Sequence, residues 1–333
     1  MSTMHTFPTL SAIRAARHRL GDRVDTTSVR RLRDDALTPR LAPGTELWLK
    51  EELFQRTGSF KPRGALTVMM SLSAEQLARG VTGVSAGNHA ISLAYSAREL
   101  HTTAKVVMPR TANPYRIALC RELGAEVVLV ETVHEAFDRA RAIEQEEGRT
   151  FVHPFEGPLT ALGTATVGME FIEQTRAHGV ELDAVVVAAG GGGLTGGVAC
   201  AVKLLAPDTA VYVVEPEGAD TLYRSFEVGA PQSIDKVRTI ADSLGAPRCE
   251  PYSYALNREY VNEVVLVSDE QILDAMRLLY RSAKLVTEPA GAASLAAVLG
   301  PLRDRLAHRH VGVVVCGGNV DSASFCAYLA GQL

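Results

Sequence analysis

One lysine stands in a setting that favours amine chemistry. Lys61 follows the aromatic Phe60 and precedes Pro62, and a helical pattern begins there. Because the N-terminal end of a helix carries partial positive charge, a cation is disfavoured there, and the pKa of the Lys61 amine should fall. A neutral amine is the form that makes Schiff bases with carbonyl compounds. The competing interpretation is an ordinary surface lysine, the usual fate of this residue type.

A block of glycines marks a second place where chemistry is expected. Gly190, Gly191, Gly192 and Gly193 lie between a β-branched run and a helical pattern. Such a turn points backbone N–H groups at a ligand, with the positive end of the helix behind them, so the block predicts a phosphate site. The glycines could instead merely permit a tight turn, although four in a row would lose much conformational entropy for that purpose.

The same block also fits a dinucleotide-binding fingerprint. Gly191, Gly193 and Gly196 satisfy the spacing G-x-G-x-x-G, and Glu215 follows near the end of the next apolar run. A NAD-binding dehydrogenase is therefore an alternative. A lone fingerprint is weak evidence, however, and Glu215 could simply end a strand.

The elements that must position these residues follow from the pattern of apolar side chains. Consecutive apolar positions bounded by Gly, Pro or charge are typical of strands buried on both faces of a parallel sheet. Such runs occupy residues 81–85, 104–109, 125–131, 150–154, 182–189, 210–216, 262–268 and 311–317. Helical patterns between them occupy residues 91–101, 113–124, 133–147, 195–205, 269–282 and 290–299. The alternation predicts an α/β fold.

One uncharged stretch, residues 184–202, is about as long as a membrane-spanning helix. The glycine block lies inside it, with a β-branched run before it and a small-residue helical pattern after it. We therefore expect a strand, a tight turn and a helix, and no association with a membrane.

The composition is that of an ordinary globular chain. The 333 residues suggest about two domains, and the formal net charge of −4 argues against a nucleic-acid partner. The five cysteines form no CxxC pair, which argues against a disulfide framework or a zinc ribbon. They are Cys120, Cys200, Cys249, Cys316 and Cys326. The first residues contain no continuous apolar segment of a signal peptide, so we expect a cytoplasmic protein.

Five motifs occur together in an order that is specific to one group of enzymes. They are SFKPRGA (59–65), SAGNHA (85–90), GGGGL (190–194), EPAGA (288–292) and CGGNVD (316–321). With these motifs the chain resembles the fold-type II enzymes that use pyridoxal 5′-phosphate (PLP), and within them the threonine/serine dehydratases and serine racemases. The resemblance implies a two-domain α/β fold like that of the tryptophan synthase β subunit. A large PLP-binding domain would comprise residues 1–65 and 157–333, and a small inserted domain residues 66–156.

The resemblance also implies roles around the cofactor. Lys61 would hold PLP as a Schiff base and then act as the base at Cα of the substrate. Phe60 would pack on one face of the pyridine ring, and Asn88 would donate to the ring 3′-oxygen. Cys316 would place a neutral thiol against the pyridine nitrogen, and Glu288 would lie near the cofactor. The phosphate would be held by the backbone of Gly190, Gly191, Gly192, Gly193 and Leu194.

The substrate is expected at a second loop. The residues that would receive its carboxylate are Ser85, Ala86, Gly87, Asn88 and His89, with His89 contributing its backbone rather than its ring. The reaction implied is the β-elimination of water from a 3-hydroxy amino acid, which yields a 2-oxo acid and ammonia. An amino-acid racemase of the same fold is the alternative. Ala86 argues against it, because racemases of this family carry a serine there as the acid and base of the second face.

Other departures concern ions and the substrate side chain. Relatives with a cation site carry an aspartate six positions after an acidic residue, whereas Thr221 follows Glu215 at that spacing, so we expect no metal. Ser243 replaces a glycine that is usual beside the ring, and the segment 251–256 is unusual. A substrate bulkier or more polar than threonine is therefore conceivable. A homodimer is expected, and no C-terminal regulatory domain, because the last motif lies near the end of the chain.

Overall fold

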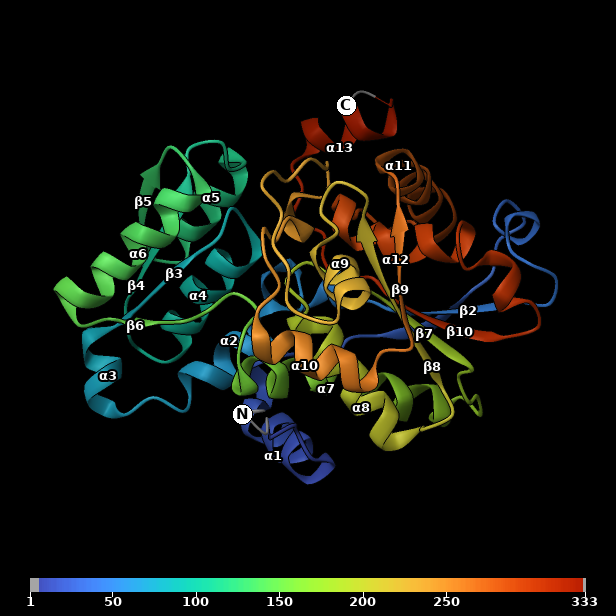
Figure 1. The fold of residues 1–333 in the computed structure, drawn as a ribbon, viewed down its shortest axis with the longest axis horizontal. Coiled ribbons are helices and arrows are strands. Elements are labelled where there is room, and N and C mark those ends of the chain that lie inside the picture. The colour runs from blue at the N-terminus through green and yellow to red at the C-terminus, as the bar shows by residue number, and fades with distance from the viewer. Residues whose placement is uncertain (1–5, 332–333) are drawn as a thin grey trace.

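The computed structural model describes residues 6–331, which form two β-sheets covered by helices (Figure 1). The larger sheet has six strands in the order β1-β2-β10-β7-β8-β9. Neighbouring strands run parallel, except that β1 and β2 pair antiparallel. The strands are β1 (Val29–Leu32), β2 (Glu46–Lys50), β10 (His310–Val314), β7 (Ala184–Ala188), β8 (Ala210–Pro216) and β9 (Glu263–Val267).

The smaller sheet has four parallel strands and is built from one continuous part of the chain. Its strands, in spatial order, are β5 (Glu126–Val130), β4 (Ala104–Pro109), β3 (Val81–Val84) and β6 (Thr150–Phe151). The accompanying helices are α3 (Ala74–Arg79), α4 (Asn88–Glu99), α5 (Pro114–Glu122) and α6 (Val133–Glu147). Figure 1 shows this part beside the larger sheet. The predicted α/β fold is thus confirmed.

Helices lie on both faces of the larger sheet. In Figure 1, α7 and α8 lie below it and α11 and α12 lie above it. The helices of this part are α1 (Leu10–Leu20), α2 (Lys61–Met69), α7 (Pro158–Ala177), α8 (Gly193–Leu205), α9 (Thr221–Val228), α10 (Pro251–Tyr260), α11 (Asp269–Leu278), α12 (Pro289–Leu299) and α13 (Ser322–Leu329). Since both faces are covered, all five residues of β7 are buried. This explains why the strand is a continuous apolar run in the sequence.

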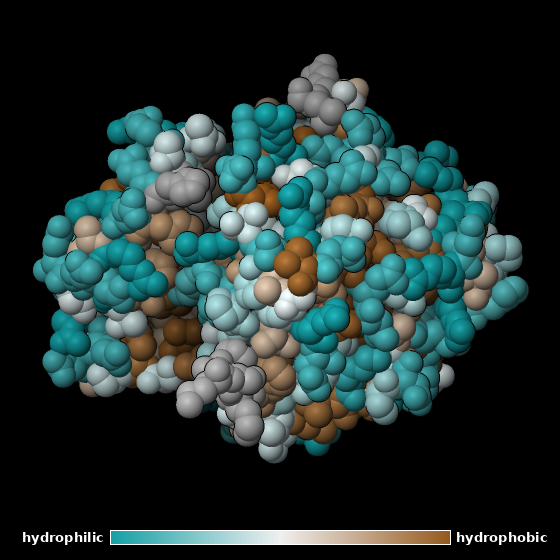
Figure 2. Space-filling model, viewed as in Figure 1, coloured by the Kyte–Doolittle hydropathy of each residue, from teal (hydrophilic) through white to brown (hydrophobic). Residues whose placement is uncertain are grey.

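The surface seen in Figure 2 is mostly hydrophilic, with apolar residues in small separate groups. The apolar side chains gather instead in one large core around the six-stranded sheet and in smaller cores around the other sheet. In residues 6–331, no helix is both long and apolar enough to cross a membrane. Residues 184–202 form β7, a turn and most of α8, as the glycine block predicts.

Several elements carry no recognisable pattern in the sequence. β1 and β2 are not among the predicted strands, and β1 is an antiparallel edge strand with two arginines in its middle. α7 is not among the predicted helices, because it is buried over most of its surface and therefore lacks an alternation of apolar and polar faces. The predicted helix over 269–282 is α11 followed by a π-helical turn, Leu279–Ala283.

Three of the loops that carry the motifs follow the carboxyl ends of parallel strands. β3 ends at Val84, directly before Ser85, and β7 ends at Ala188, shortly before the glycine block. β10 ends at Val314, shortly before Cys316. Ligands of open α/β sheets bind at these strand ends. The topology therefore gathers the predicted site residues at the facing ends of the two sheets.

Candidate active site

The amine of Lys61 lies in a desolvated position at the start of α2. Its Nζ donates a hydrogen bond to the carbonyl of Pro154 (2.7 Å) and lies 5.2 Å from the centroid of the Phe60 ring. Burial lowers the pKa of Lys61 to about 8, although Cys316 and Glu288 act in the opposite direction. The predicted direction of the shift is therefore correct. Its main cause is desolvation rather than the helix terminus.

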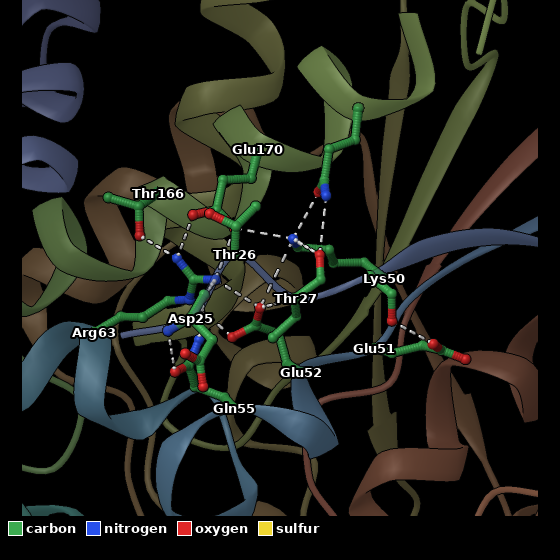
Figure 3. A network of polar contacts seen from close by, with 12 residues as sticks. Asp25, Thr26, Thr27, Lys50, Glu51, Glu52, Gln55, Arg63, Thr166 and Glu170 are labelled. Carbon is green, nitrogen blue, oxygen red and sulfur yellow. Dashed lines mark hydrogen bonds and ion pairs between the residues drawn. The ribbon is translucent and has the colours of Figure 1, made fainter. Parts of the chain in front are cut away.

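Buried ion pairs fix the helix that carries Lys61. Arg63, two residues further along α2, is fully buried and donates to the carboxylates of Glu52 and Glu170 at 2.7–2.9 Å (Figure 3). Although burial disfavours the carboxylate of Glu170, Arg63 and Lys50 lower its pKa to about 2. The first turn of α2 is thus tied to the start of the larger sheet and to α7.

Lys50 completes this network from the end of β2. Its Nζ donates to Glu170 (2.9 Å), Gln174 (2.7 Å) and the carbonyl of Thr27 (2.9 Å) (Figure 3). Lys50 is fully buried, and desolvation lowers its pKa. Because its charge is met by Glu170 and by neutral acceptors, the ammonium is satisfied without water.

The glycine block forms the turn between β7 and α8. Gly192 has a φ of 83°, and the helix begins at Gly193, so the first N–H groups of α8 face the loop. A Cβ on Gly191 would lie 2.2 Å from the Phe155 ring, and one on Gly193 would lie 2.3 Å from the Phe155 carbonyl oxygen. The glycines are therefore needed for close approach of the backbone as well as for the turn.

Residues of α10 hold the glycine block in place by hydrogen bonds. Asn257 donates to the carbonyl of Gly192 (2.9 Å) and accepts from Thr195 (2.6 Å). At the start of α10, the Glu156 carboxylate accepts from the backbone N–H groups of Tyr252 (2.8 Å) and Ser253 (3.0 Å). The unusual segment 251–256 thus lies against the loop and the residues beside Phe155.

The second loop, Ser85 to Asn88, leads from β3 into α4. The Ser85 hydroxyl accepts from the N–H of Gly87 (3.0 Å), and Asn88 is the first residue of α4. Ser85 and Ala86 are half-buried, whereas Gly87 and Asn88 are buried. A Cβ on Gly87 would lie 2.9 Å from Nη1 of Arg116, so this glycine permits the close approach of a guanidinium.

The ring of His89 is buried and hydrogen-bonded to the backbone. Its Nε2 lies 2.9 Å from the carbonyl of Val152, which can only accept, so Nε2 carries the proton. Burial lowers the pKa of His89 to about 3. A neutral ring whose Nε2 hydrogen is already donated is not a free general base.

Cys316 lies at the carboxyl end of β10 and is buried. Its thiol donates to the carbonyl of Ala290 (3.4 Å), and its own carbonyl accepts from the N–H of Phe60 (3.2 Å). Burial raises the pKa of Cys316, and Glu288 raises it further. The group therefore stays a neutral thiol, one residue from the backbone bridge between Ser59 and Gly317.

Glu288 and Arg116 form a buried ion pair. The sequence predicts Glu288 near the cofactor, but it does not single out Arg116. Arg116, from α5, donates to Glu288 (2.9 Å), to Asp242 (2.6 Å) and to the carbonyl of Asn319 (2.9 Å). Glu288 is 1% exposed and Arg116 is 4% exposed. The sequence marks α5 by its N-terminal Asn-Pro, but nothing in it shows that Arg116 turns inward across to the larger sheet.

Ser243 stands at the edge of this cluster. Its Oγ lies 3.3 Å from Glu288 and 3.4 Å from Asn88, at the long end of hydrogen bonding. Asp242, beside it, is half exposed to solvent on its side chain. The position where relatives carry a glycine therefore places a hydroxyl between Glu288 and Asn88.

Glu215 is not available to a dinucleotide. It is fully buried at the end of β8, and its carboxylate accepts from the backbone N–H groups of Leu222 (3.0 Å) and Tyr223 (2.8 Å) at the start of α9. Burial raises its pKa to about 8. Glu215 thus serves as an acceptor for the first N–H groups of α9, and this local role explains its place after the glycine block. Across the described part of the chain, no group of three or more His, Cys, Asp and Glu side chains is placed to hold a metal ion.

Several of the predicted residues face one small cavity between the sheets. It is lined by Phe60, Lys61, Gly64, Ala65, His89, His153, Pro154, Phe155, Thr160, Thr164, Gly193 and Leu194. The amine of Lys61 and the start of α8 therefore lie on the same cavity. Cys316, Glu288 and Asn88 do not line this cavity, but Cys316 is hydrogen-bonded to the backbone of Phe60, and Asn88 directly precedes His89, and both Phe60 and His89 line it.

Comparison with known proteins identifies the relatives of this chain. The family described as "Pyridoxal-phosphate dependent enzyme" matches residues 35–317. The chain is 52% identical over 324 residues to a protein of Ralstonia pickettii named phenylserine dehydratase, covering 97% of each. It is 38% identical to an L-threonine ammonia-lyase of Thermotoga maritima, covering 84% of this chain and 68% of that protein. Among solved structures, maize serine racemase matches with a TM-score of 0.89 at 31% identity, covering 98% of both chains.

Proposed function

This chain belongs to the family of pyridoxal-phosphate dependent enzymes, and from this premise we propose how its residues act and on which substrate. It is a PLP-dependent dehydratase, an ammonia-lyase that converts a 3-hydroxy amino acid into a 2-oxo acid and ammonia. The observation that carries the proposal is the amine of Lys61, with a pKa of about 8, on the same cavity as Gly193 and Leu194 at the end of the glycine block. The NAD-binding alternative is wrong, since the family uses PLP.

The residues present fit this cofactor. Side chains on Gly191 and Gly193 would collide with Phe155, so only a bare backbone can line the cradle for the phosphate. We assign the phosphate to Gly190, Gly191, Gly192, Gly193 and Leu194. The remaining residues that would hold PLP are Phe60, Lys61, Asn88, Glu288 and Cys316. When bound, the pyridoxal ring supplies a place for the electron pair that remains at Cα after its proton is removed.

Lys61 supplies the amine that binds the cofactor and the base that removes the Cα proton. Both roles need the neutral form, and burial lowers the pKa of Lys61 so that this form is common near neutral pH. The hydrogen bond to Pro154 and the network around Arg63 hold the start of α2 in place. Proton transfer to and from Cα therefore relies on a group fixed by its helix rather than on a mobile surface lysine.

Cys316 favours elimination over reactions that need a full carbanion. Its thiol is neutral, because burial raises its pKa. It therefore provides no negative charge that would keep a proton on a ring nitrogen. A weaker electron sink suits a substrate that expels its own β-hydroxyl group.

The loop of Ser85, Ala86, Gly87, Asn88 and His89 is the proposed site of the substrate carboxylate. Its backbone leads into the N-terminus of α4, which favours an anion. Ala86 carries no group that could move a proton on the second face of the substrate. We therefore expect no racemisation of the substrate. Analysis of the unreacted substrate for the opposite enantiomer tests this.

We propose that the substrate carries an aromatic ring on Cβ, as in 3-phenylserine. The relative at 52% identity is named for that substrate, while others are named for threonine and for 3-hydroxyaspartate. Apolar and aromatic side chains line part of the cavity, namely Phe60, Phe155 and Leu194, beside polar residues such as Thr160 and Thr164. The nearby cation Arg116 is paired with both Asp242 and Glu288, which leaves it without free charge for a carboxylate on Cβ.

A substrate panel tests the proposal. The purified protein, loaded with PLP, is assayed for 2-oxo acid and ammonia with 3-phenylserine, threonine, serine and 3-hydroxyaspartate. We expect kcat/KM to be at least about tenfold higher for 3-phenylserine than for the others, the size of effect that one buried apolar group gives. Lys61→Ala should lose both activity and the visible absorbance of the Schiff base between the lysine and PLP. A colourless wild-type protein without activity on any member of the panel would contradict the proposal.

Two further proposals concern the whole chain. We propose that residues 66–156 form a small domain, with the cofactor between it and a large domain of residues 1–65 and 157–333. This is supported by the smaller sheet, which lies within 81–151. We also propose a cytoplasmic homodimer, supported by exposed apolar side chains such as Phe54 and Tyr280. Light scattering on the purified protein tests the dimer, and fractionation of cells that express it tests the compartment.

A further inference from the structure

The carboxamide of Asn88 is held in one orientation, because each of its neighbours Asn319 and Glu288 is fixed as either a hydrogen-bond donor or an acceptor. The carbonyl of Thr57 can only accept, so the atom of Asn319 that faces it at 2.7 Å must be the amide nitrogen. The same nitrogen lies 2.7 Å from Asn88, whose facing atom must therefore be the oxygen. The nitrogen of Asn88 then faces Glu288 at 2.6 Å. Each assignment follows from donor and acceptor chemistry alone.

This arrangement needs Glu288 as an acceptor. A carboxylate accepts on both oxygens: one faces the nitrogen of Asn88 and the other faces a nitrogen of Arg116, and neither nitrogen can accept a hydrogen. Glu288 is 1% exposed, and burial raises its pKa, which favours the protonated form. Asp242 acts in the same direction, while Arg116 lowers the pKa of Glu288. The guanidinium therefore works against the effect of burial.

Of the groups that lower the pKa of Glu288, Arg116 has the largest effect. It comes from a helix beside the smaller sheet. It lies on α5, beside the smaller sheet, whereas Glu288 caps α12 behind the larger one. Its side chain is fixed at three points, by Glu288, by Asp242 and by the carbonyl of Asn319. Asn319 is also the residue that holds the oxygen of Asn88. Arg116 thus touches both partners of the Asn88 carboxamide without touching the carboxamide itself.

We propose that Arg116 is a positioning residue for Asn88: it keeps Glu288 as an acceptor and thereby fixes the carboxamide with its N–H side toward the cofactor oxygen. The inference rests on the proposed function, in which Asn88 contacts PLP. Of the two hydrogens on the Asn88 nitrogen, one is donated to Glu288, and the other is left for the cofactor, apart from the long contact of 3.4 Å to Ser243.

A double-mutant cycle on cofactor affinity tests this. The dissociation constant of PLP is measured by titrating the cofactor-free forms of wild type, Arg116→Met, Asn88→Ala and the double variant. We expect each single variant to bind PLP about tenfold more weakly, which corresponds to about 1.4 kcal/mol. If Arg116 acts through Asn88, the double variant should be no more than about twofold weaker than Asn88→Ala, because the effects are not additive. The absorption spectrum of bound PLP should change in the same way in both single variants.

Controls separate a positioning role from a structural one. Arg116→Lys, which keeps the charge toward Glu288, should recover part of the affinity. Arg110→Ala breaks an exposed ion pair with Glu131 near the same sheet and should leave affinity and spectrum unchanged. If Arg116→Met does not fold, Arg116→Gln takes its place in the cycle, because it also removes the charge but keeps a polar side chain.

The outcomes distinguish this inference from the proposed function. Additive losses in the double variant, or an Arg116→Met protein with unchanged affinity and spectrum, would overturn the role of Arg116 and leave the dehydratase assignment intact. A wild-type protein that binds no PLP would overturn the proposed function itself.

Discussion

At the scale of single residues, the site depends on groups whose protonation is set by burial. Lys61 is moved toward its neutral form, Cys316 is kept as a thiol, and His89 is kept as a neutral ring. Each shift has desolvation as its largest cause, because the charged form loses more on leaving water than the neutral form does. The same physical effect thus produces a nucleophilic amine, a neutral partner and an inert imidazole in one small region.

The pKa of Lys61 predicts how cofactor loading depends on pH. Below about 8 the amine is protonated and cannot attack the aldehyde of PLP, and above about 8 it is free. The rate of loading should therefore fall about tenfold per pH unit below this value and level off above it. Stopped-flow absorbance of the cofactor-free protein mixed with PLP between pH 6 and 9.5 measures this. A rate that still rises steeply at pH 9.5 would show an unshifted lysine.

At the scale of elements, α2 is fixed by charges rather than by apolar packing alone. Arg63 and Lys50 bring two positive charges into a region where Glu52 and Glu170 supply two negative ones (Figure 3). Burial of such a set adds little net stability, but removal of one member leaves an unpaired charge inside the protein. The network therefore holds the catalytic helix in one position more than it stabilises the fold.

Replacing Glu170 by glutamine tests the network. The substitution leaves Arg63 and Lys50 with too little negative charge, so we expect the free energy of unfolding to fall by about 3–5 kcal/mol. Chemical denaturation followed by circular dichroism measures this. Glu173→Gln is the matched control on the same helix, because Glu173 pairs with Arg14 in an exposed salt bridge. It should change stability by less than about 0.5 kcal/mol.

The turn between β7 and α8 gives a second prediction at this scale. Gly193→Ala places a Cβ 2.3 Å from the backbone oxygen of Phe155, whereas Gly191→Ala places it 2.2 Å from the Phe155 ring. The ring can rotate away, but the backbone cannot do so without moving the loop. We expect Gly193→Ala to weaken PLP binding more than Gly191→Ala does, by about tenfold or more. Equal losses in a PLP titration would show that the side chain of Phe155 is as fixed as its backbone.

At the scale of the whole molecule, the site exists because two sheets present their carboxyl strand ends to each other. Contacts across this junction include Arg116 with Glu288 and Asp242, and Asn113 with Asp321 (2.6 Å). Arg116 lies on α5, beside the smaller sheet, and Asn113 is the residue that caps this helix. In the proposed position, the cofactor would contact Asn88 on one side and Lys61 and Cys316 on the other. It would therefore join the two parts of the chain.

Loading with cofactor should accordingly stabilise the protein as a whole. A ligand that binds only the folded chain adds about 2.7 kcal/mol at a concentration one hundred times its dissociation constant. We expect the thermal unfolding midpoint to rise with PLP concentration. The rise should be smaller in Lys61→Ala, which keeps the cradle but loses the covalent bond. An unfolding midpoint that does not depend on PLP would contradict the proposed position of the cofactor.

The sequence by itself determined the parts of the protein that are local. Lys61 before a helix, the glycine block between a strand and a helix, and the apolar strands are each readable from a few neighbouring residues, because backbone conformation and helix termini depend on nearby side chains. The α/β fold follows from such local patterns, the dehydratase function follows from the family resemblance that the five motifs carry, and the comparisons confirm both.

Only the tertiary structure decided which distant side chains meet. It joined Arg116 to Glu288, Arg63 to Glu170 and Asn257 to the glycine turn, and it placed the segment 251–256 behind that turn. It also shows that Glu215 is buried against the start of α9, so this residue is not available to bind the ribose of a dinucleotide. These pairings are set by the packing of helices on sheets. A residue's own neighbours in the chain do not reveal which way its side chain turns or how much water it loses, and these two quantities fix its partner and its pKa.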